Sequence, residues 1–340
     1  MFSNYNEVKE NAKKVLDGAC QVCPICDGKA CIGQVPGCGS KGRGAGFIDC
    51  RKYFDSIKIG MDAVHEHFEP DTSVELFGKK FSLPFCAAPT GGMKLNYGGK
   101  LEEDEFAKAV VFGCKNNGTF AWTGDGPDDN IFLKPLSAIK EAGGIAVTAI
   151  KPWDQDKAFA RIKELEAAGN MAFGMDVDAA ALINLKLAGK PVYTKSEAEL
   201  KELVDSTKMP FIVKGVLTPR AAERCAKAGC YGIVVSNHGG RIIEDAPAPI
   251  SVLKDIKSAV GNSIKIFVDG GVRSGADIFK CLALGADEVM IARPFVTAVH
   301  GGGEEGVKLL IEKYTSELKE IMLMTDCKTI SDINKDKIIL

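Results

Sequence analysis

Eight short apolar segments recur along the chain after residue 82, and a segment of helical character follows each one. The expected strands are 83–89, 119–123, 145–150, 172–177, 211–216, 232–236, 264–269 and 288–292. The expected helices are 102–115, 135–142, 154–168, 196–207, 219–228, 249–260, 274–284 and 307–324. Continuous apolar runs are typical of buried parallel strands, and each parallel crossover needs a helix. The pattern therefore predicts a (β/α)8 TIM barrel. An open doubly wound sheet is the alternative, but eight regular units favour closure.

The N-terminal region lacks this pattern. We expect a helix over residues 1–17, then a cysteine-rich and glycine-rich segment without periodicity up to residue 54, and short strands at 57–59, 73–77 and 80–83. The fold class is accordingly an α/β barrel with a cysteine-rich N-terminal extension. We divide the chain into an N-terminal segment, 1–54, and a barrel domain, 55–340.

Six of the twelve cysteines fall within the first fifty residues. Cys20, Cys23, Cys26 and Cys31 are separated by two, two and four residues. Thiolates two residues apart on a turn can point at one ion, so these four could form a cage for zinc or for an iron–sulfur cluster. The two-residue spacings resemble a bacterial ferredoxin run, which the four-residue spacing does not complete, and zinc remains equally open. Incidental thiols in a small loop are the alternative. Disulfides are a poor explanation in a chain that shows no secretion signal.

Composition and charge exclude several classes of function. The formal net charge of -2 gives no reason to expect binding to nucleic acid or to an anionic membrane. No apolar run approaches the ~20 residues of a membrane span, and the polar N-terminus lacks the apolar stretch of a signal peptide. We therefore expect a cytoplasmic protein that acts on a small molecule.

Polar residues cluster where the expected strands end. The sixth strand delivers His238 and Arg241 on a glycine-containing loop, a composition suited to moving a proton beside an anion. The seventh and eighth strands end in Asp269-Gly-Gly-Val-Arg273 and Ala292-Arg293. Glycines let backbone N–H groups approach an anion and arginines supply charge, so these loops predict a phosphate site. All strand ends of a barrel face one mouth, which brings both sites together.

Four stretches carry a family resemblance. They read APT (88–90), VSNHGGR (235–241), FVDGGVRSGADIFK (267–280) and IARPF (291–295). In these the chain resembles the FMN-dependent α-hydroxy acid oxidase and dehydrogenase family, which includes glycolate oxidase and lactate oxidase. The resemblance extends from about residue 81 to the C-terminus and is strongest over the last 130 or so residues.

The resemblance implies an FMN cofactor and a role for each matching residue. His238 would be the base that removes a substrate proton, Arg241 would clamp the substrate carboxylate, and Asp178 would orient the histidine. Lys214 would stabilise the negative charge of reduced flavin. The cofactor-binding residues would be Pro89, Thr90, Gly91, Thr123, Thr148, Asp176, Lys214, Ser236, Asp269, Gly270, Gly271, Arg273, Ala292 and Arg293.

Departures from the family concern the substrate. The N-terminal tyrosine of the family has no equivalent here, and Thr148 and Ile150 replace a glutamine and a tyrosine. Asp176 puts a negative charge where the family has a threonine. The insertion that carries a second substrate arginine is short, since only 37 residues separate Asp176 from Lys214. Either the substrate differs, or residues such as Lys151 or Arg43 bind its carboxylate.

Three functions remain open from the sequence. The leading hypothesis is oxidation of a small 2-hydroxy acid, such as L-lactate or glycolate, to the 2-oxo acid. The second is another FMN-barrel reaction such as that of type 2 isopentenyl diphosphate isomerase. The third is an electron-transfer flavoprotein that uses the cysteine cluster. The expected partners are the substrate, an electron-acceptor protein and further copies of the chain in a homo-oligomer.

Overall fold

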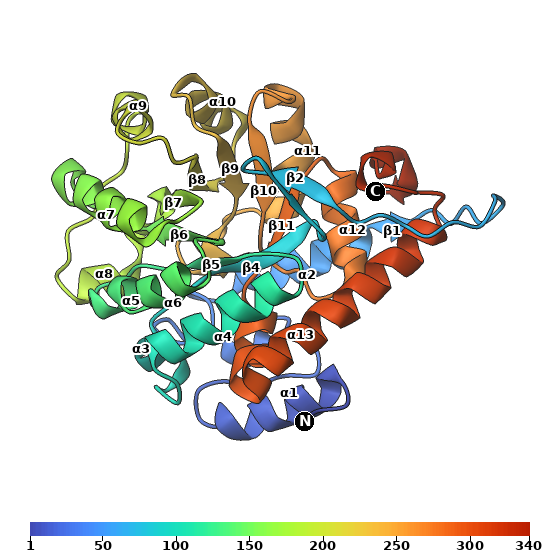
Figure 1. Ribbon diagram of the computed structural model, residues 1–340, viewed down its shortest axis with the longest axis horizontal. Helices are drawn as coiled ribbons and strands as arrows, with labels where there is room; N and C mark the ends of the chain where they lie inside the picture. The colour runs from blue at the N-terminus through green and yellow to red at the C-terminus, as the bar shows by residue number, and fades with distance from the viewer.

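Eight parallel strands close into a barrel in the computed structural model, which describes all residues 1–340 (Figure 1). Around the barrel the strands follow the order β10-β11-β4-β5-β6-β7-β8-β9. Their bounds are Phe85–Thr90 (β4), Ala121–Thr123 (β5), Ala146–Ile150 (β6), Ala172–Asp176 (β7), Phe211–Val216 (β8), Gly232–Val235 (β9), Lys265–Val268 (β10) and Glu288–Ile291 (β11). The closed (β/α)8 barrel is confirmed, and the open sheet is excluded.

Side chains fill the barrel interior. Trp122 and Phe267 meet edge to face, with ring centroids 6.0 Å apart, among apolar residues of the other strands. Gly174 makes room for this packing, because a Cβ there would lie 2.5 Å from the Trp122 ring. Phe77 and Phe81, from the hairpin of β2 (Val74–Leu76) and β3 (Lys79–Phe81), pack on Phe120 below the strands. The hairpin thus closes the end of the barrel opposite the strand C-termini.

Helices surround the barrel at the positions the periodicity predicts. They are Glu103–Asn116 (α4), Pro135–Glu141 (α6), Gln155–Ala168 (α7), Glu197–Asp205 (α9), Pro219–Lys227 (α10), Pro249–Val260 (α11), Gly275–Ala283 (α12) and Arg293–Leu323 (α13). Side chains of Asp154, Ser196, Thr218 and Ser274 cap the first turns of four of them. Helix α13 begins earlier than the expected 307, directly after β11, and Gly303 with φ of +56° breaks it in two.

The N-terminal segment packs on the barrel. Helix α1 (Tyr5–Val15) lies against α13 (Figure 1), and the Tyr5 hydroxyl donates to the Pro294 carbonyl at 3.1 Å. Helix α2 (Ala45–Ser56) was not expected, because the glycine-rich run before it hides its start. Strands β1 (Lys58–Ile59) and β12 (Ile338–Ile339) pair antiparallel and join the C-terminus to the segment that follows α2.

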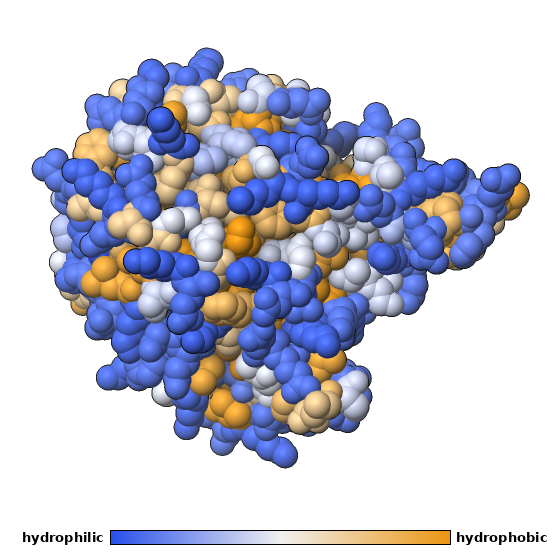
Figure 2. Space-filling view, viewed as in Figure 1, coloured by the Kyte–Doolittle hydropathy of each residue, from blue (hydrophilic) through white to orange (hydrophobic).

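Three further short helices border the barrel mouth: Met93–Tyr97 (α3), Asn130–Leu133 (α5) and Ile183–Leu187 (α8). None of the helices combines the length and the apolar character that crossing a bilayer would require. Hydrophilic residues predominate on the face shown in Figure 2, and apolar residues there form separate small groups.

Candidate active site

The strand ends line one cavity at the barrel mouth. Most of the residues expected to bind cofactor or substrate are among those that line it: Pro89, Thr90, Gly91, Asp176, Lys214, His238, Arg241, Asp269, Gly270, Gly271, Arg273, Ala292 and Arg293. Ser236 and Asp178 lie directly behind this lining and contact Lys214 and His238, respectively. The barrel therefore brings together residues that are up to 204 positions apart in sequence, from Pro89 to Arg293.

Thr123 and Thr148 lie deeper. Both are buried, and their hydroxyls bond each other at 2.8 Å. Asn170 donates a further bond to the Thr148 hydroxyl at 2.8 Å. These contacts join β5 and β6 below the cavity and leave neither threonine among the residues that line it.

His238 is held in a strained conformation. Its φ of +56° lies in the left-handed region, which a residue other than glycine adopts at a cost of about 1–3 kcal/mol. Its Nδ1 lies 3.0 Å from Oδ1 of Asp178, and its backbone N–H donates to the Ser236 hydroxyl at 3.1 Å. Gly215 makes room for the carboxylate, since a Cβ there would lie 2.5 Å from Asp178 Cγ. The imidazole is thus fixed through one nitrogen.

Four buried charged side chains of alternating sign lie in a row beside His238. Lys151 Nζ lies 2.6 Å from Asp176 Oδ2, and Lys214 Nζ lies 3.5 Å from Asp176 Oδ1 and 3.6 Å from Asp269 Oδ2. Burial alone would raise the pKa of Asp176, but Lys151 and Lys214 hold it below its usual range. Burial lowers the pKa of Lys214, yet Asp269 and Asp176 outweigh it and the net shift is upward. Asp176 and Lys214 therefore both stay charged at neutral pH, as a mutually stabilising buried pair.

This network accounts for the unexpected Asp176. The extra negative charge, relative to the family threonine, is neutralised by Lys151, which follows β6. Asp176, Asp178 and His238 have ligand atoms within 4.8 Å of one another, as a metal site would require. Two ammonium groups already face Asp176, so a cation bound there would be repelled.

The two candidates for a new carboxylate ligand differ in position. Arg43 is the wrong choice, because its side chain is 76% exposed and pairs with Glu244 and Asp245 outside the cavity. Lys151 lines the cavity, but its ammonium is engaged by Asp176. Asp125, which the sequence did not single out, fixes the Lys151 loop by accepting bonds from the Lys151 N–H at 3.1 Å and from Trp153 Nε1 at 2.6 Å.

Arg241 points into the cavity from the loop after β9. Its Nη2 donates to Asn96 Oδ1 at 2.9 Å, and its Nε has no hydrogen-bond partner although it is buried. Asn96 lies on α3, which the sequence did not reveal as part of the site. A buried guanidinium with an open donor is suited to binding a carboxylate.

The N-terminal segment covers the expected phosphate end. Gly270 and Gly271 have φ of +95° and +88°, which only glycine adopts without strain. Arg273 Nε donates to the Cys26 carbonyl at 3.1 Å, and Arg293 Nε donates to the Cys38 carbonyl at 3.0 Å. The Phe47 ring, from α2, stacks on Arg293 with 3.8 Å between guanidinium and ring centre.

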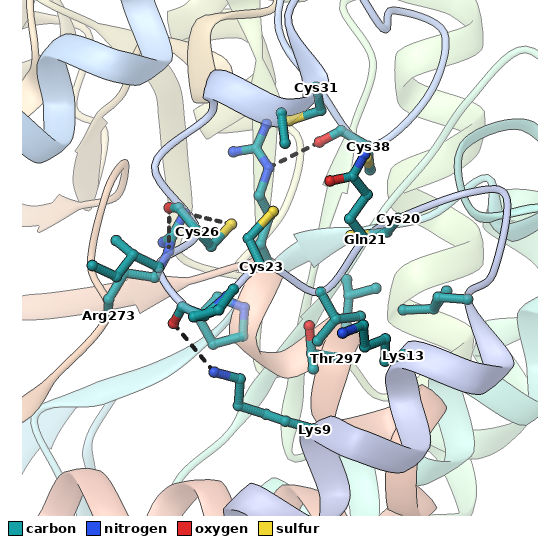
Figure 3. A pocket seen from close by; sticks show the side chains of 18 of the residues that line it. Lys9, Lys13, Cys20, Gln21, Cys23, Cys26, Cys31, Cys38, Arg273 and Thr297 are labelled. Carbon is teal, nitrogen blue, oxygen red and sulfur yellow. Dashed lines mark hydrogen bonds between the residues drawn. The ribbon is translucent and has the colours of Figure 1, made fainter.

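The four cysteines of the N-terminal motif lie on the other side of Arg273 and Arg293. They line a second, larger cavity of about 1000 Å³ (Figure 3). Cys38 lines the same cavity, and none of the cysteines forms a disulfide.

Comparison with known proteins gives consistent matches. A family profile described as FMN-dependent dehydrogenase matches residues 38–190 and 185–340. 2-Hydroxyacid oxidase 2 of Mus musculus is 28% identical over 319 residues, which are 84% of this chain and 87% of that protein. A peroxisomal (S)-2-hydroxyacid oxidase of Arabidopsis thaliana is 38% identical over 54% of this chain and 48% of its own length. An L-lactate oxidase of a Roseobacter species is 38% identical over 44% of this chain and 40% of its own length.

The chain thus spans less than half the length of the last two relatives. Among solved structures, a mandelate oxidase aligns with a TM-score of 0.79 at 24% identity over 97% of this chain and 96% of that chain. This likeness shows a shared fold.

Proposed function

The chain belongs to the FMN-dependent dehydrogenase family, and from this premise we propose that it oxidises a small 2-hydroxy acid to the 2-oxo acid. The observation that carries the proposal is the convergence of three groups on one cavity. These are an imidazole fixed by a carboxylate, a buried guanidinium with an open donor, and a buried lysine. Oxidation of a 2-hydroxy acid needs a base for a proton, a clamp for a carboxylate and a positive charge for the electron acceptor.

The residues present fit the isoalloxazine and ribityl parts of FMN. Asp269 Oδ1 is buried without a hydrogen-bond partner, as expected of an acceptor that awaits a ligand hydroxyl. Lys214 supplies a buried cation at the end of β8, and Gly270 and Gly271 allow a ligand to approach the backbone. Arg273 and Arg293 would hold the phosphate, for which their present bonds to backbone carbonyls would have to be shared or exchanged. When bound, FMN takes up the two electrons that leave the substrate.

The chain's own residues would orient the substrate and move its proton. Asp178 keeps the Nδ1 proton of His238 in place, so that Nε2 is the nitrogen free to accept a proton from the substrate. As His238 gains that proton, the Asp178 carboxylate at 3.0 Å stabilises the imidazolium. Arg241 would make a two-point contact with the substrate carboxylate, and its hydrogen bond to Asn96 would be either replaced by this contact or kept beside it.

The pairing of Asp176 with Lys151 has a consequence for substrate recognition. Since Lys151 is engaged, Arg241 is left as the carboxylate clamp, and Asn96 takes the place of a second polar contact. Leu95, Ile131 and Leu182 also line the cavity and would face the substrate's side chain. We infer a preference for short apolar 2-hydroxy acids.

The test is the absorbance of the bound flavin without oxygen. The purified protein is mixed with glycolate, L-lactate, longer 2-hydroxy acids and mandelate, and the oxidised-flavin band and the 2-oxo acid are measured. We expect bleaching by at least one short acid, with one product formed per flavin reduced. If no member of the panel bleaches the flavin, the proposed function is wrong.

A further inference from the structure

Five thiols surround one cavity beside the barrel mouth. Cys20, Cys23, Cys26, Cys31 and Cys38 line it, and Figure 3 shows their side chains around it. The first four are only partly buried, whereas the other eight cysteines of the chain are buried, like ordinary small core residues. Four partly buried thiols within 12 consecutive positions, Cys20 to Cys31, are not explained by core packing.

The spacing of the thiols argues against a single metal ion. Four thiolates at about 2.3 Å from a tetrahedral zinc stand about 3.8 Å from one another. In this structure no three cysteine sulfurs lie within 4.8 Å of one another. Thiolates that bind an iron–sulfur cluster stand further apart, because the inorganic core lies between them. The lack of a close triple of sulfurs and the cavity of about 1000 Å³ fit a cluster better than a single ion.

The charge around the cavity fits as well. An iron–sulfur cluster with four thiolate ligands carries net negative charge, and its potential responds to hydrogen bonds at the sulfurs. Arg273 Nη2 lies 3.5 Å from Cys26 Sγ, and its Nε holds the Cys26 carbonyl at 3.1 Å. Arg293 binds the Cys38 carbonyl at 3.0 Å on the far side. Two fixed cations therefore face the space between the sulfurs.

From these observations we propose that Cys20, Cys23, Cys26 and Cys31 bind an iron–sulfur cluster. The loop that carries them is supported from below, since Gly28 has φ of +89° and lies against the Phe47 ring, where a Cβ would be 2.6 Å from ring carbon. The Cys38 thiol lies on a separate turn and donates to Gln34 Oε1 at 3.7 Å. Cys38 is a neighbour of the cluster and not one of its ligands.

The position of the cluster also suggests a role for it. This role rests on the proposed function, whereas the metal site itself does not. Arg273 and Arg293 line both cavities, so the cluster adjoins the phosphate end of the flavin site. Oxidation of the substrate leaves two electrons on the flavin. A cluster held by these cysteines would pass the two electrons, one at a time, to a protein that carries single electrons. Two molecules of the oxidised carrier are reduced for each 2-hydroxy acid.

The experiment is the metal content of the whole protein purified without oxygen. Iron, acid-labile sulfide, zinc and FMN are measured per chain, and the dithionite-reduced protein is examined by electron paramagnetic resonance. We expect iron and sulfide in equal amounts, roughly four each for a cubane cluster, with zinc at background. Stoichiometric zinc without sulfide, or no metal at all, would overturn the proposal.

Single substitutions test the ligands. Cys23→Ser should lose iron and sulfide but keep FMN. Cys38→Ser and the control Cys230→Ser, a buried cysteine of the barrel, should keep iron, sulfide and FMN. If Cys38→Ser loses the cluster and Cys31→Ser keeps it, the ligand assignment is wrong. Adding the best 2-hydroxy acid separates the two proposals, because a reduced-cluster signal should follow flavin bleaching in the wild type. A flavin that never bleaches refutes the function alone, and a bleached flavin without that signal refutes the relay.

Discussion

Replacing Asp178 by asparagine removes the charge behind His238 without changing the size of the side chain. The Asp178–His238 pair is mostly shielded, with side-chain exposures of 12% and 16% and a 3.0 Å contact, so solvent weakens it little. A hydrogen bond to a charged group contributes about 1.5–3 kcal/mol. At about 1.4 kcal/mol per factor of ten, loss of this interaction by itself should lower the rate of flavin reduction roughly 10- to 150-fold.

Asparagine also alters the tautomer. Its amide N–H can donate to Nδ1 of His238, which moves the ring proton to Nε2 and blocks the base. The FMN content should not change, because Asp178 lies behind the cavity lining. The assay is anaerobic stopped-flow reduction of bound FMN under saturating 2-hydroxy acid. The matched control is Asp205→Asn, an exposed carboxylate on α9. If Asp178→Asn reduces its flavin as fast as the control, the base assignment is wrong.

Three further predictions concern the clamp and the buried charges. Arg241→Lys should raise the KM for the acid about tenfold or more in steady-state assays at unchanged FMN content, because the two-point contact is lost. Lys151→Met should lower the free energy of unfolding in urea by about 3–5 kcal/mol, and Lys151→Met with Asp176→Asn should recover part of it, since the single change leaves a buried carboxylate half paired. Burial raises the pKa of Glu288, and the neighbouring Cys86 thiol offsets this only in part. Folded protein thus holds that proton, and stability falls as pH rises above the usual carboxyl range of about 4. Glu288→Gln should therefore raise stability by roughly 1–3 kcal/mol at pH 8 but not near pH 4, as thermal unfolding would show.

The barrel strands could be predicted because each is determined by the apolar character of its own short segment. Each expected strand agrees with the structure to within about two residues at either end, since a strand buried on both faces must be a continuous apolar run. Helix α2 was missed although Phe47, Cys50 and Phe54 are buried at helical spacing, because the glycine-rich run before it hides its start. The start of α13 was missed because Gly301, Gly302 and Gly303 interrupt its pattern, although Pro294 stands in its first turn.

In the site, too, features set by local sequence could be predicted and contacts between distant segments could not. The residues at strand ends followed from the geometry of any closed barrel and from family motifs. The pairing of Lys151 with Asp176, the contact of Asn96 with Arg241 and the stacking of Phe47 on Arg293 all join distant segments. Arg43 was a wrong candidate for a related reason. Nothing in the glycine-rich sequence around it indicates that its side chain faces outward and pairs with Glu244.

The most direct test of the account is whether His238 is needed to reduce bound FMN. His238→Ala is mixed with the acid that bleaches the wild type, without oxygen, and the oxidised-flavin absorbance is followed alongside the wild type. We predict that the variant keeps its FMN and that its flavin stays oxidised on the timescale of wild-type bleaching. A variant that retains FMN and bleaches at a rate close to that of the wild type would contradict the account.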